Sequence, residues 1–179
     1  MTQGTARRLV PIVSLDVVGY SRMIEADESA AHELVQSLFT HRIPLTMSEV
    51  GGSIFKTMGD GLLAEFSSLV SAIDWAAKLQ EDLFRNPVHA PNGMPLKLRV
   101  GAVLADVMVE GEDRFGEGIN LAVRVQVRAP PGGLAITKWS YEYLSGKLDL
   151  VFDDIGPQAL KNVSKTVRLF IWHPDWRLQ

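Results

Sequence analysis

Two aspartates in the chain are placed where a divalent cation could be bound. Asp16 ends the apolar segment 9–15, and Asp60 lies in the glycine-bearing turn 57–61 between two short apolar segments. Mg²⁺ binds through a few carboxylate oxygens and keeps positions open for substrate phosphates. Two such ions can stabilise the attacking and leaving oxygens of a phosphoryl transfer. Taken singly, each aspartate is better explained by a turn, as a strand-end cap or as an Asp-Gly hairpin turn.

A second set of polar residues occupies the string DRFGEGINLAVR, residues 113–124. Asn120 and Arg124 are four residues apart, so they share one face of a helix. An amide and a guanidinium on one face can bind a ribose and a phosphate, and arginine stabilises developing phosphoryl charge. Taken alone, this pair is better explained as an ordinary solvated helix face. The loop at residues 17–21 adds backbone N–H groups that could reach phosphate oxygens.

The apolar pattern predicts the elements that position these side chains. Segment 9–15 is typical of a strand buried on both faces, 53–56 and 62–66 indicate a hairpin, and 96–104 with 106–110 indicates a further strand. Helices are predicted from residue 27 or 29 to the Gly-Gly pair at 51–52, with a kink or break at Pro44, and from residue 67 or 68 to about 84. This order predicts an α+β fold, a ferredoxin-like βαββαβ core with helices on one face of an antiparallel sheet. Asp16 and Asp60 then face each other across neighbouring strands.

The rest of the chain is predicted to extend this core. A helix is expected at 119–127, a strand at 134–137, a short helix at 138–143, and closing strands at 149–152 and 167–172, which together form a C-terminal α/β extension. Residues 19–21, 86–95 and 111–117 are expected to be loops. We expect a single domain from 9 to 173, with an N-terminal tail at 1–8 and a C-terminal tail at 174–179.

Composition and charge exclude several further classes of function and of site. The 179 residues carry a net charge of −3, which argues against a non-specific nucleic-acid binder. The absence of cysteine excludes disulfides, thiolate metal sites and cysteine nucleophiles. No apolar run approaches the roughly 18–20 residues of a membrane span, and the first eight residues are polar. We therefore expect a cytoplasmic protein that binds neither nucleic acid nor membrane.

Taken together, the motifs resemble the catalytic domain of class III nucleotidyl cyclases, which form cyclic AMP or cyclic GMP from the nucleoside triphosphate. The matching stretches are LDVVGYSRMIEADE from Leu15, FKTMGDGLLAEF from Phe55, and residues 113–124, with a weaker match of LKNV from Leu160. The resemblance extends from residue 10 to 172. It implies a reaction in which the ribose 3′-oxygen attacks the α-phosphorus and pyrophosphate leaves, assisted by two Mg²⁺ or Mn²⁺ ions.

The resemblance also implies a role for each matched residue. Asp16 and Asp60 would bind the metals, together with the backbone carbonyl of Val17. Asn120 would orient the ribose and Arg124 would stabilise the transition state. The remaining positions would bind substrate: Lys56 and Asp113 at the base, Lys161 at the polyphosphate, and the loop residues Val18, Gly19, Tyr20 and Ser21 at the phosphates.

The choice of base follows from hydrogen-bond chemistry. A lysine only donates and a carboxylate only accepts. Lys56 with Asp113 therefore fits the N1 acceptor and the amino donor of adenine, whereas guanine reverses this pattern. The resemblance thus implies an adenylate cyclase that uses ATP. In the family the metal aspartates come from one subunit and the other residues from the second, which implies a homodimer, with a regulatory domain or partner possible in addition.

Several alternatives stay open from the sequence. The domain could be a catalytically weak or inactive cyclase-like regulatory domain, or a guanylate cyclase. A diguanylate cyclase lacks support because its GG[DE]EF turn is absent, and nothing demands a phosphohydrolase. One departure concerns Val103 and Ala105, since close relatives often read GINLGD where this chain reads GAVLAD. The favoured interpretation is that this strand packs differently; the other is weakened substrate placement.

Overall fold

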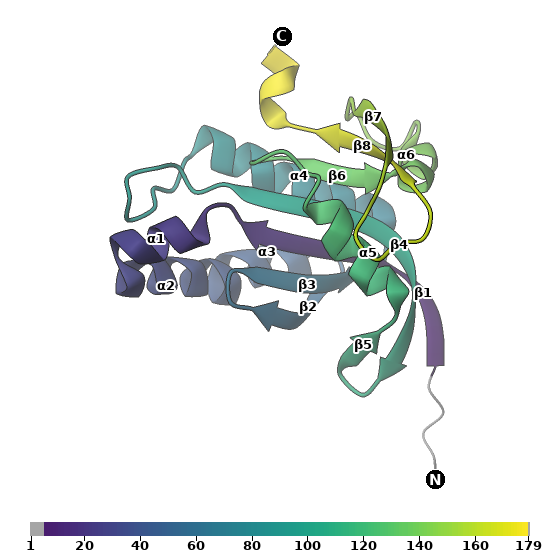
Figure 1. The fold of residues 1–179 in the computed structure, drawn as a ribbon, viewed down its shortest axis with the longest axis horizontal. Helices are drawn as coiled ribbons and strands as arrows, with labels where there is room; N and C mark the ends of the chain where they lie inside the picture. The colour runs from purple at the N-terminus through teal and green to yellow at the C-terminus, as the bar shows by residue number, and fades with distance from the viewer. Residues whose placement is uncertain (1–5, 179) are drawn as a thin grey trace.

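The computed structural model describes residues 6–178 of the 179-residue chain. Residues 6–110 form an antiparallel sheet in the order β2-β3-β1-β4 (Figure 1). This order and the intervening helices confirm the predicted ferredoxin-like core. The four strands are β1 (Ala6–Val17), β2 (Gly52–Met58), β3 (Gly61–Phe66) and β4 (Leu98–Glu110).

The second half of the chain extends the sheet beyond β4. β6 (Leu134–Thr137) pairs in parallel with β4, β8 (Val167–Trp172) pairs with β6, and β7 (Asp153–Gln158) forms the far edge. The strand expected at 149–152 was wrong, because those residues run without strand pairing into β7. The loop expected at 111–117 contains a short strand, β5 (Asp113–Phe115), which folds back on β4. The short helix α6 spans Lys138–Leu144.

Helices join the first strands with two local departures from the expected pattern. Residues 20 and 21 do not continue a loop but begin α1 (Tyr20–Ala26), because Gly19 adopts a left-handed φ of 73° and its carbonyl accepts the first helical bonds. α2 (Glu28–Ser37) is capped by Asp27, whose carboxylate accepts from the amide of Ala30. The break expected at Pro44 is a π-helical turn (Leu38–Arg42) followed by α3 (Ile43–Ser48).

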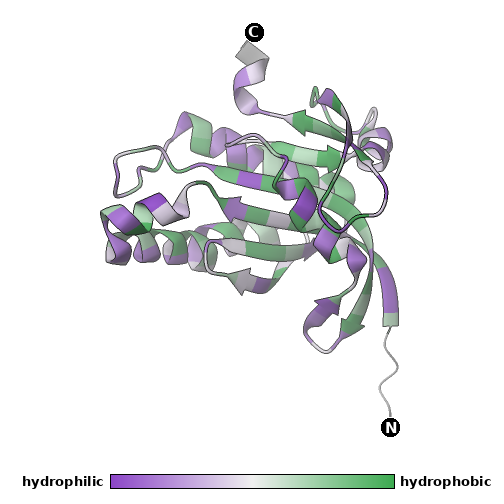
Figure 2. Cartoon of the chain, viewed as in Figure 1, coloured by the Kyte–Doolittle hydropathy of each residue, from purple (hydrophilic) through white to green (hydrophobic). Residues whose placement is uncertain are grey.

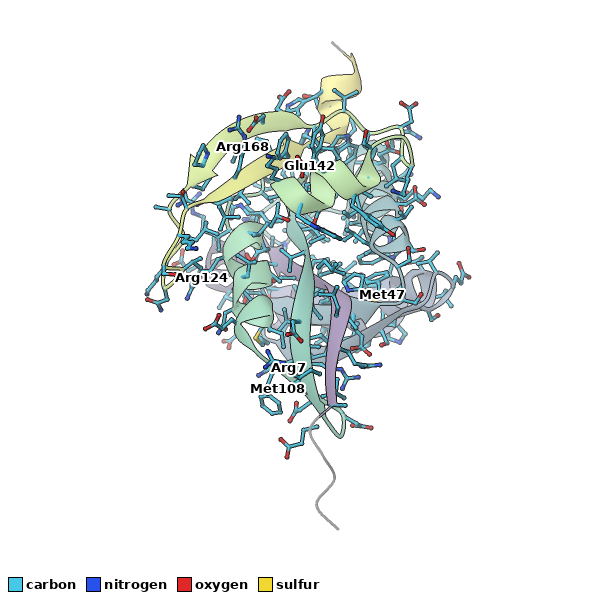
Figure 3. The ribbon with its side chains drawn as sticks, turned by 90° about the vertical axis from the view of Figure 1, so that its right-hand side faces the viewer. Arg7, Met47, Met108, Arg124, Glu142 and Arg168 are labelled. Atoms are coloured by element: carbon cyan, nitrogen blue, oxygen red, sulfur yellow. The ribbon has the colours of Figure 1, made fainter. Side chains whose placement is uncertain are left out.

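Helices cover both faces of the sheet. α2, α3 and the long α4 (Leu69–Arg85) pack on one face, as predicted, whereas α5 (Glu117–Gln126) lies on the opposite face. Figure 3 shows this separation, with Arg124 of α5 on one side of the sheet and Met47 of α3 on the other. Each face has its own apolar core, and the strands between them are correspondingly hydrophobic (Figure 2). The last turn is a 3₁₀ helix (Pro174–Leu178).

α5 packs on β4 through close backbone contacts. Val103 is fully buried and Ala105 is 4% exposed, both in the core beneath α5. A Cβ on Gly118 would lie 2.3 Å from the Cβ of Ala105, and one on Gly101 would lie 2.4 Å from the amide nitrogen of Gln126. Val103 and Ala105, at which this chain differs from close relatives, are therefore accommodated by packing against α5, which has Gly118 at the contact.

Adding one methyl group at this contact is expected to weaken the packing of α5 on β4 and so to destabilise the fold. Alanine ordinarily stabilises a helix by about 1 kcal/mol relative to glycine. We nevertheless expect Gly118→Ala to lower the free energy of unfolding by about 1–2 kcal/mol, because the new methyl overlaps Ala105. Denaturant titration at fixed protein concentration measures the change. Adding Ala105→Gly to the same chain should restore most of the loss, and a single variant as stable as wild type would contradict the contact.

Candidate functional site

The structure brings Asp16 and Asp60 together at the end of β1. Asp16 pairs across the ladder with Gly61, and the amide of Val17 donates to the backbone carbonyl of Asp60 at 2.9 Å. Burial and, after it, the neighbouring Asp60 carboxylate raise the pKa of Asp16 from 3.8 to about 6, while the charge of Arg99 opposes the shift. The two carboxylates are therefore close enough to repel each other, which the topology predicted.

This pair has the chemistry of a partial metal site. No group of three or more His, Cys, Asp or Glu side chains that could hold a metal ion occurs within residues 6–178. A cation held here would have the two carboxylates, with the Val17 carbonyl beside them, and would take its remaining ligands from water or from a substrate. Such an ion would offset the burial and the carboxylate repulsion that raise the Asp16 pKa, so the donor set fits a hard divalent cation bound together with phosphates.

The raised pKa predicts that Asp16 destabilises the metal-free protein. Its folded pKa of about 6 lies above the ordinary value of 3.8, so the folded state binds more protons between these values and stability falls as pH rises through them. Allowing for solvent screening of this half-buried group, we expect Asp16→Asn to be about 1 kcal/mol more stable than wild type above about pH 7 in chelator. The gain should vanish below about pH 4. Denaturant titrations across this pH range provide the measurement, and a difference independent of pH would contradict the assignment.

The loop after β1 offers fewer amides than the sequence indicates. The Val17 amide binds Asp60, and the Val18 amide donates to the carbonyl of Lys97 at 2.9 Å. These two N–H groups are therefore not available to phosphates, which corrects the expectation that the whole 17–21 loop donates. Gly19, Tyr20 and Ser21 supply the first amides of α1 and lie next to the aspartate pair in the chain.

A second group of matched residues lines a groove on the α5 side of the sheet. Asn120, Arg124 and Lys161 all border this open groove of about 1080 Å³. Asn120 and Arg124 project from α5, with Arg124 half-buried, whereas Lys161 comes from the loop between β7 and β8. Two separate elements therefore contribute side chains to one groove. Figure 3 shows Arg124 at this surface.

Lys56 and Asp113 occupy a third place, at the β2 edge. Lys56 pairs with Leu63 just after a bulge in β2, and both Lys56 and Asp113 are exposed. The β5 strand that begins with Asp113 packs against β2 as well as pairing with β4. The contact between β2 and β5 therefore brings together the two strands that carry Lys56 and Asp113.

The single chain does not gather every matched residue in one cavity. Neither the Asp16–Asp60 pair nor the Lys56–Asp113 pair is among the residues that line the groove. Sequence reasoning also missed Arg99, which β1–β4 pairing places opposite Asp16. Its charge moderates the Asp16 pKa, and only the strand register reveals this neighbour.

The chain is similar in sequence to proteins that are named as adenylate cyclases. No family model matches the chain. It is 39% identical over 171 residues, 96% of its length, to a protein named "Putative adenylate cyclase 3" of Rhizobium meliloti (strain 1021). It is 30% identical over 122 residues, 68% of its length, to an adenylate cyclase of Streptomyces coelicolor. The chain spans 29% and 30% of these two relatives, less than a third of each.

Comparison with solved structures also finds a cyclase of similar fold. A crystal structure of an adenylate/guanylate cyclase/hydrolase from Silicibacter pomeroyi superposes with a TM-score of 0.88 and 28% identity, over 96% of this chain and all of that one. Among the described residues, no helix has the length and apolar character needed to cross a membrane.

Proposed function

The chain belongs to the class III adenylate/guanylate cyclase catalytic domains, and on that premise we propose that it is an adenylate cyclase that converts ATP to 3′,5′-cyclic AMP and pyrophosphate. The observation that carries the proposal is the adjacency of Asp16 and Asp60 at the end of β1, separate from the groove that holds Asn120 and Arg124. This is the division of parts that a two-subunit site requires.

The aspartate pair is proposed to hold the metals. Asp16, Asp60 and the Val17 carbonyl would bind two Mg²⁺ or Mn²⁺ ions, which supply Lewis-acid activation of the ribose 3′-hydroxyl and neutralise triphosphate charge. The first amides of α1, at Tyr20 and Ser21, would donate to phosphate oxygens. The triphosphate would then lie at the end of β1, beside Asp16 and Asp60.

The groove residues are proposed to act on the ribose and the reacting phosphorus. Asn120 would hydrogen-bond the ribose and hold its 3′-oxygen in line with the α-phosphorus. Arg124 would stabilise the charge that develops on the phosphoryl oxygens, and Lys161 would bind the polyphosphate. The new bond joins the 3′-oxygen to the α-phosphorus while the bond to the bridging oxygen of pyrophosphate breaks. The hydroxyl proton passes to water or to the substrate.

Base recognition is assigned to Lys56 and Asp113. The ammonium of Lys56 would donate to N1 of adenine, and the Asp113 carboxylate would accept from the amino group. Guanine would place a donor against Lys56 and an acceptor against Asp113. Because unpaired polar groups at a desolvated base are costly, this pair favours ATP over GTP.

The separation of the parts supports a homodimer. One subunit would supply Asp16 and Asp60, and the second would supply Lys56, Asp113 and the groove residues, so that a symmetric pair forms two sites. A monomer would then be inactive.

The proposal is tested by product analysis. Purified protein is incubated with ATP or GTP and Mn²⁺ or Mg²⁺, and cyclic nucleotide and pyrophosphate are quantified. Cyclic AMP from ATP alone, abolished by Asp60→Ala, is the expected result. Cyclic GMP as the main product would make the chain a guanylate cyclase. No product from a sample shown to be dimeric would instead indicate an inactive, regulatory domain.

A further inference from the structure

Arg114 links the β4–β5 hairpin to β3 through an ion pair. Arg114 on β5 donates from Nε and Nη2 to the two carboxylate oxygens of Glu65 on β3, at 2.7 and 2.9 Å. The two side chains are only 12% and 17% exposed, although the residues are 49 positions apart in sequence. A bidentate pair shielded from water in this way fixes both distance and orientation.

The third nitrogen of the same guanidinium closes the turn that carries Asp113. Nη1 of Arg114 donates to the backbone carbonyls of Gly111 and Asp113, at 3.3 and 3.2 Å. The guanidinium carbon also lies 6.0 Å from the ring centre of Phe55, the neighbour of Lys56 on β2. Arg114 therefore contacts both the backbone of one base-reading residue and the residue next to the other.

Arg114 binds the carboxylate of Glu65 rather than that of the adjacent Asp113. Hydrogen bonding from Arg114 holds the pKa of Glu65 below its ordinary value, although burial opposes the shift. A second cation, Arg8, lies 3.5 Å from the same carboxylate. All three nitrogens of Arg114 are engaged, and no described residue forms a hydrogen bond or ion pair with the Asp113 carboxylate. That carboxylate stays available to a ligand.

We propose that Arg114, held by Glu65, is a positioning residue for base recognition, which fixes Asp113 relative to Lys56 and keeps the Asp113 carboxylate free for the adenine amino group. This inference rests on the proposed function, in which Lys56 and Asp113 read the base. Without Glu65, Arg114 can pair with Asp113 and mask the acceptor that distinguishes adenine from guanine. Without Arg114, the turn is released and the spacing of the two base-reading groups is lost.

The test measures discrimination between bases. For wild type, Arg114→Met and Glu65→Gln, kcat and KM are determined with ATP and with GTP. Equilibrium binding of 3′-deoxyATP and 3′-deoxyGTP, which lack the attacking hydroxyl, is measured in parallel. We expect either substitution to reduce the ATP-to-GTP ratio of kcat/KM about tenfold or more, mainly by raising KM for ATP, and to reduce the ratio of affinities similarly.

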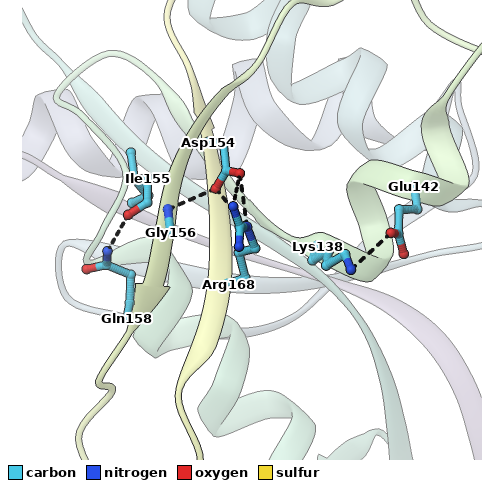
Figure 4. Close-up of polar contacts among 7 residues, drawn as sticks. All are labelled: Lys138, Glu142, Asp154, Ile155, Gly156, Gln158 and Arg168. Carbon is cyan, nitrogen blue, oxygen red and sulfur yellow. Dashed lines mark hydrogen bonds and ion pairs between the residues drawn. The ribbon is translucent and has the colours of Figure 1, made fainter.

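A matched control exists at the opposite edge of the sheet. Arg168 on β8 makes a bidentate pair with Asp154 on β7, with contacts of 2.6–3.1 Å (Figure 4). Arg168→Met removes a bidentate arginine–carboxylate pair from another hairpin, where the two side chains are 47% and 35% exposed, so we expect it to leave the ratio at the wild-type value. Glu65→Gln preserves side-chain size, so it serves if Arg114→Met does not fold.

Each outcome decides the inference. An unchanged ratio in a folded Glu65→Gln or Arg114→Met variant overturns it, and so does an equal decrease in Arg168→Met. If wild type binds 3′-deoxyATP but forms no product, the proposed catalysis fails while the binding ratio still decides the role of Arg114. If wild type binds neither 3′-deoxynucleotide, both proposals are overturned.

Discussion

Replacing Arg124 with alanine is expected to lower kcat about 10²- to 10³-fold while KM for ATP changes little. Arg124 is half-buried in the groove on α5, where solvent screening is reduced. Its proposed contact is with charge that develops only during transfer, so its loss should affect the transition state more than the bound substrate. Steady-state kinetics with ATP and Mn²⁺ measure both constants.

The control for this variant is Arg85, an exposed arginine outside the groove. Arg85 ends α4, on the opposite face of the sheet from α5. Arg85→Ala should retain nearly wild-type kcat and KM. A large rise in KM for Arg124→Ala with kcat preserved would show that the arginine contributes to ground-state binding and would contradict its assigned role.

Replacing Asp60 with alanine is expected to reduce kcat/KM at least about 10³-fold at any attainable metal concentration. The pair with Asp16 would lose one of its two carboxylates, while the Val17 amide would keep its backbone partner at position 60. The fold should therefore survive, and the remaining carboxyl should titrate lower, because the Asp60 charge helps to raise its pKa.

Two measurements separate this effect from general damage. NMR titration of Asp16 in the metal-free variant should give a pKa below the wild-type value of about 6. Asp153→Asn, which alters an exposed carboxylate at the start of β7, should retain wild-type activity. An active Asp60→Ala enzyme would remove the aspartate pair from the mechanism.

Local sequence signals predicted the elements that position the site. The hairpin around Asp60 and the caps at Asp27 and Ser68 follow from turn and capping chemistry within a few residues, and the structure has them. The strand expected at 149–152 failed for a physical reason. Leu150 and Phe152 pack against the core, so they produce an apolar alternation without belonging to a strand. Alternation reports burial, not hydrogen bonding.

Contacts between distant segments could not be predicted. β5 is three residues long and exists because β4 is long enough to pair with it. The Glu65–Arg114 pair joins residues 49 positions apart, and Arg99 faces Asp16 only through the register of β1 and β4. The proximity of Asp16 and Asp60 could be predicted, because the ferredoxin-like topology alone places the hairpin beside the first strand.

The most direct test of a composite cyclase site is to mix two inactive variants. Asp60→Ala and Arg124→Ala are purified separately, combined in equal amounts, and assayed for cyclic AMP with ATP and Mn²⁺. Random exchange makes half of the dimers mixed, and each mixed dimer has one intact site, so about a quarter of wild-type activity should return. A mixture no more active than either variant alone, with mixed dimers demonstrated by differential tagging, would contradict a site shared between two subunits.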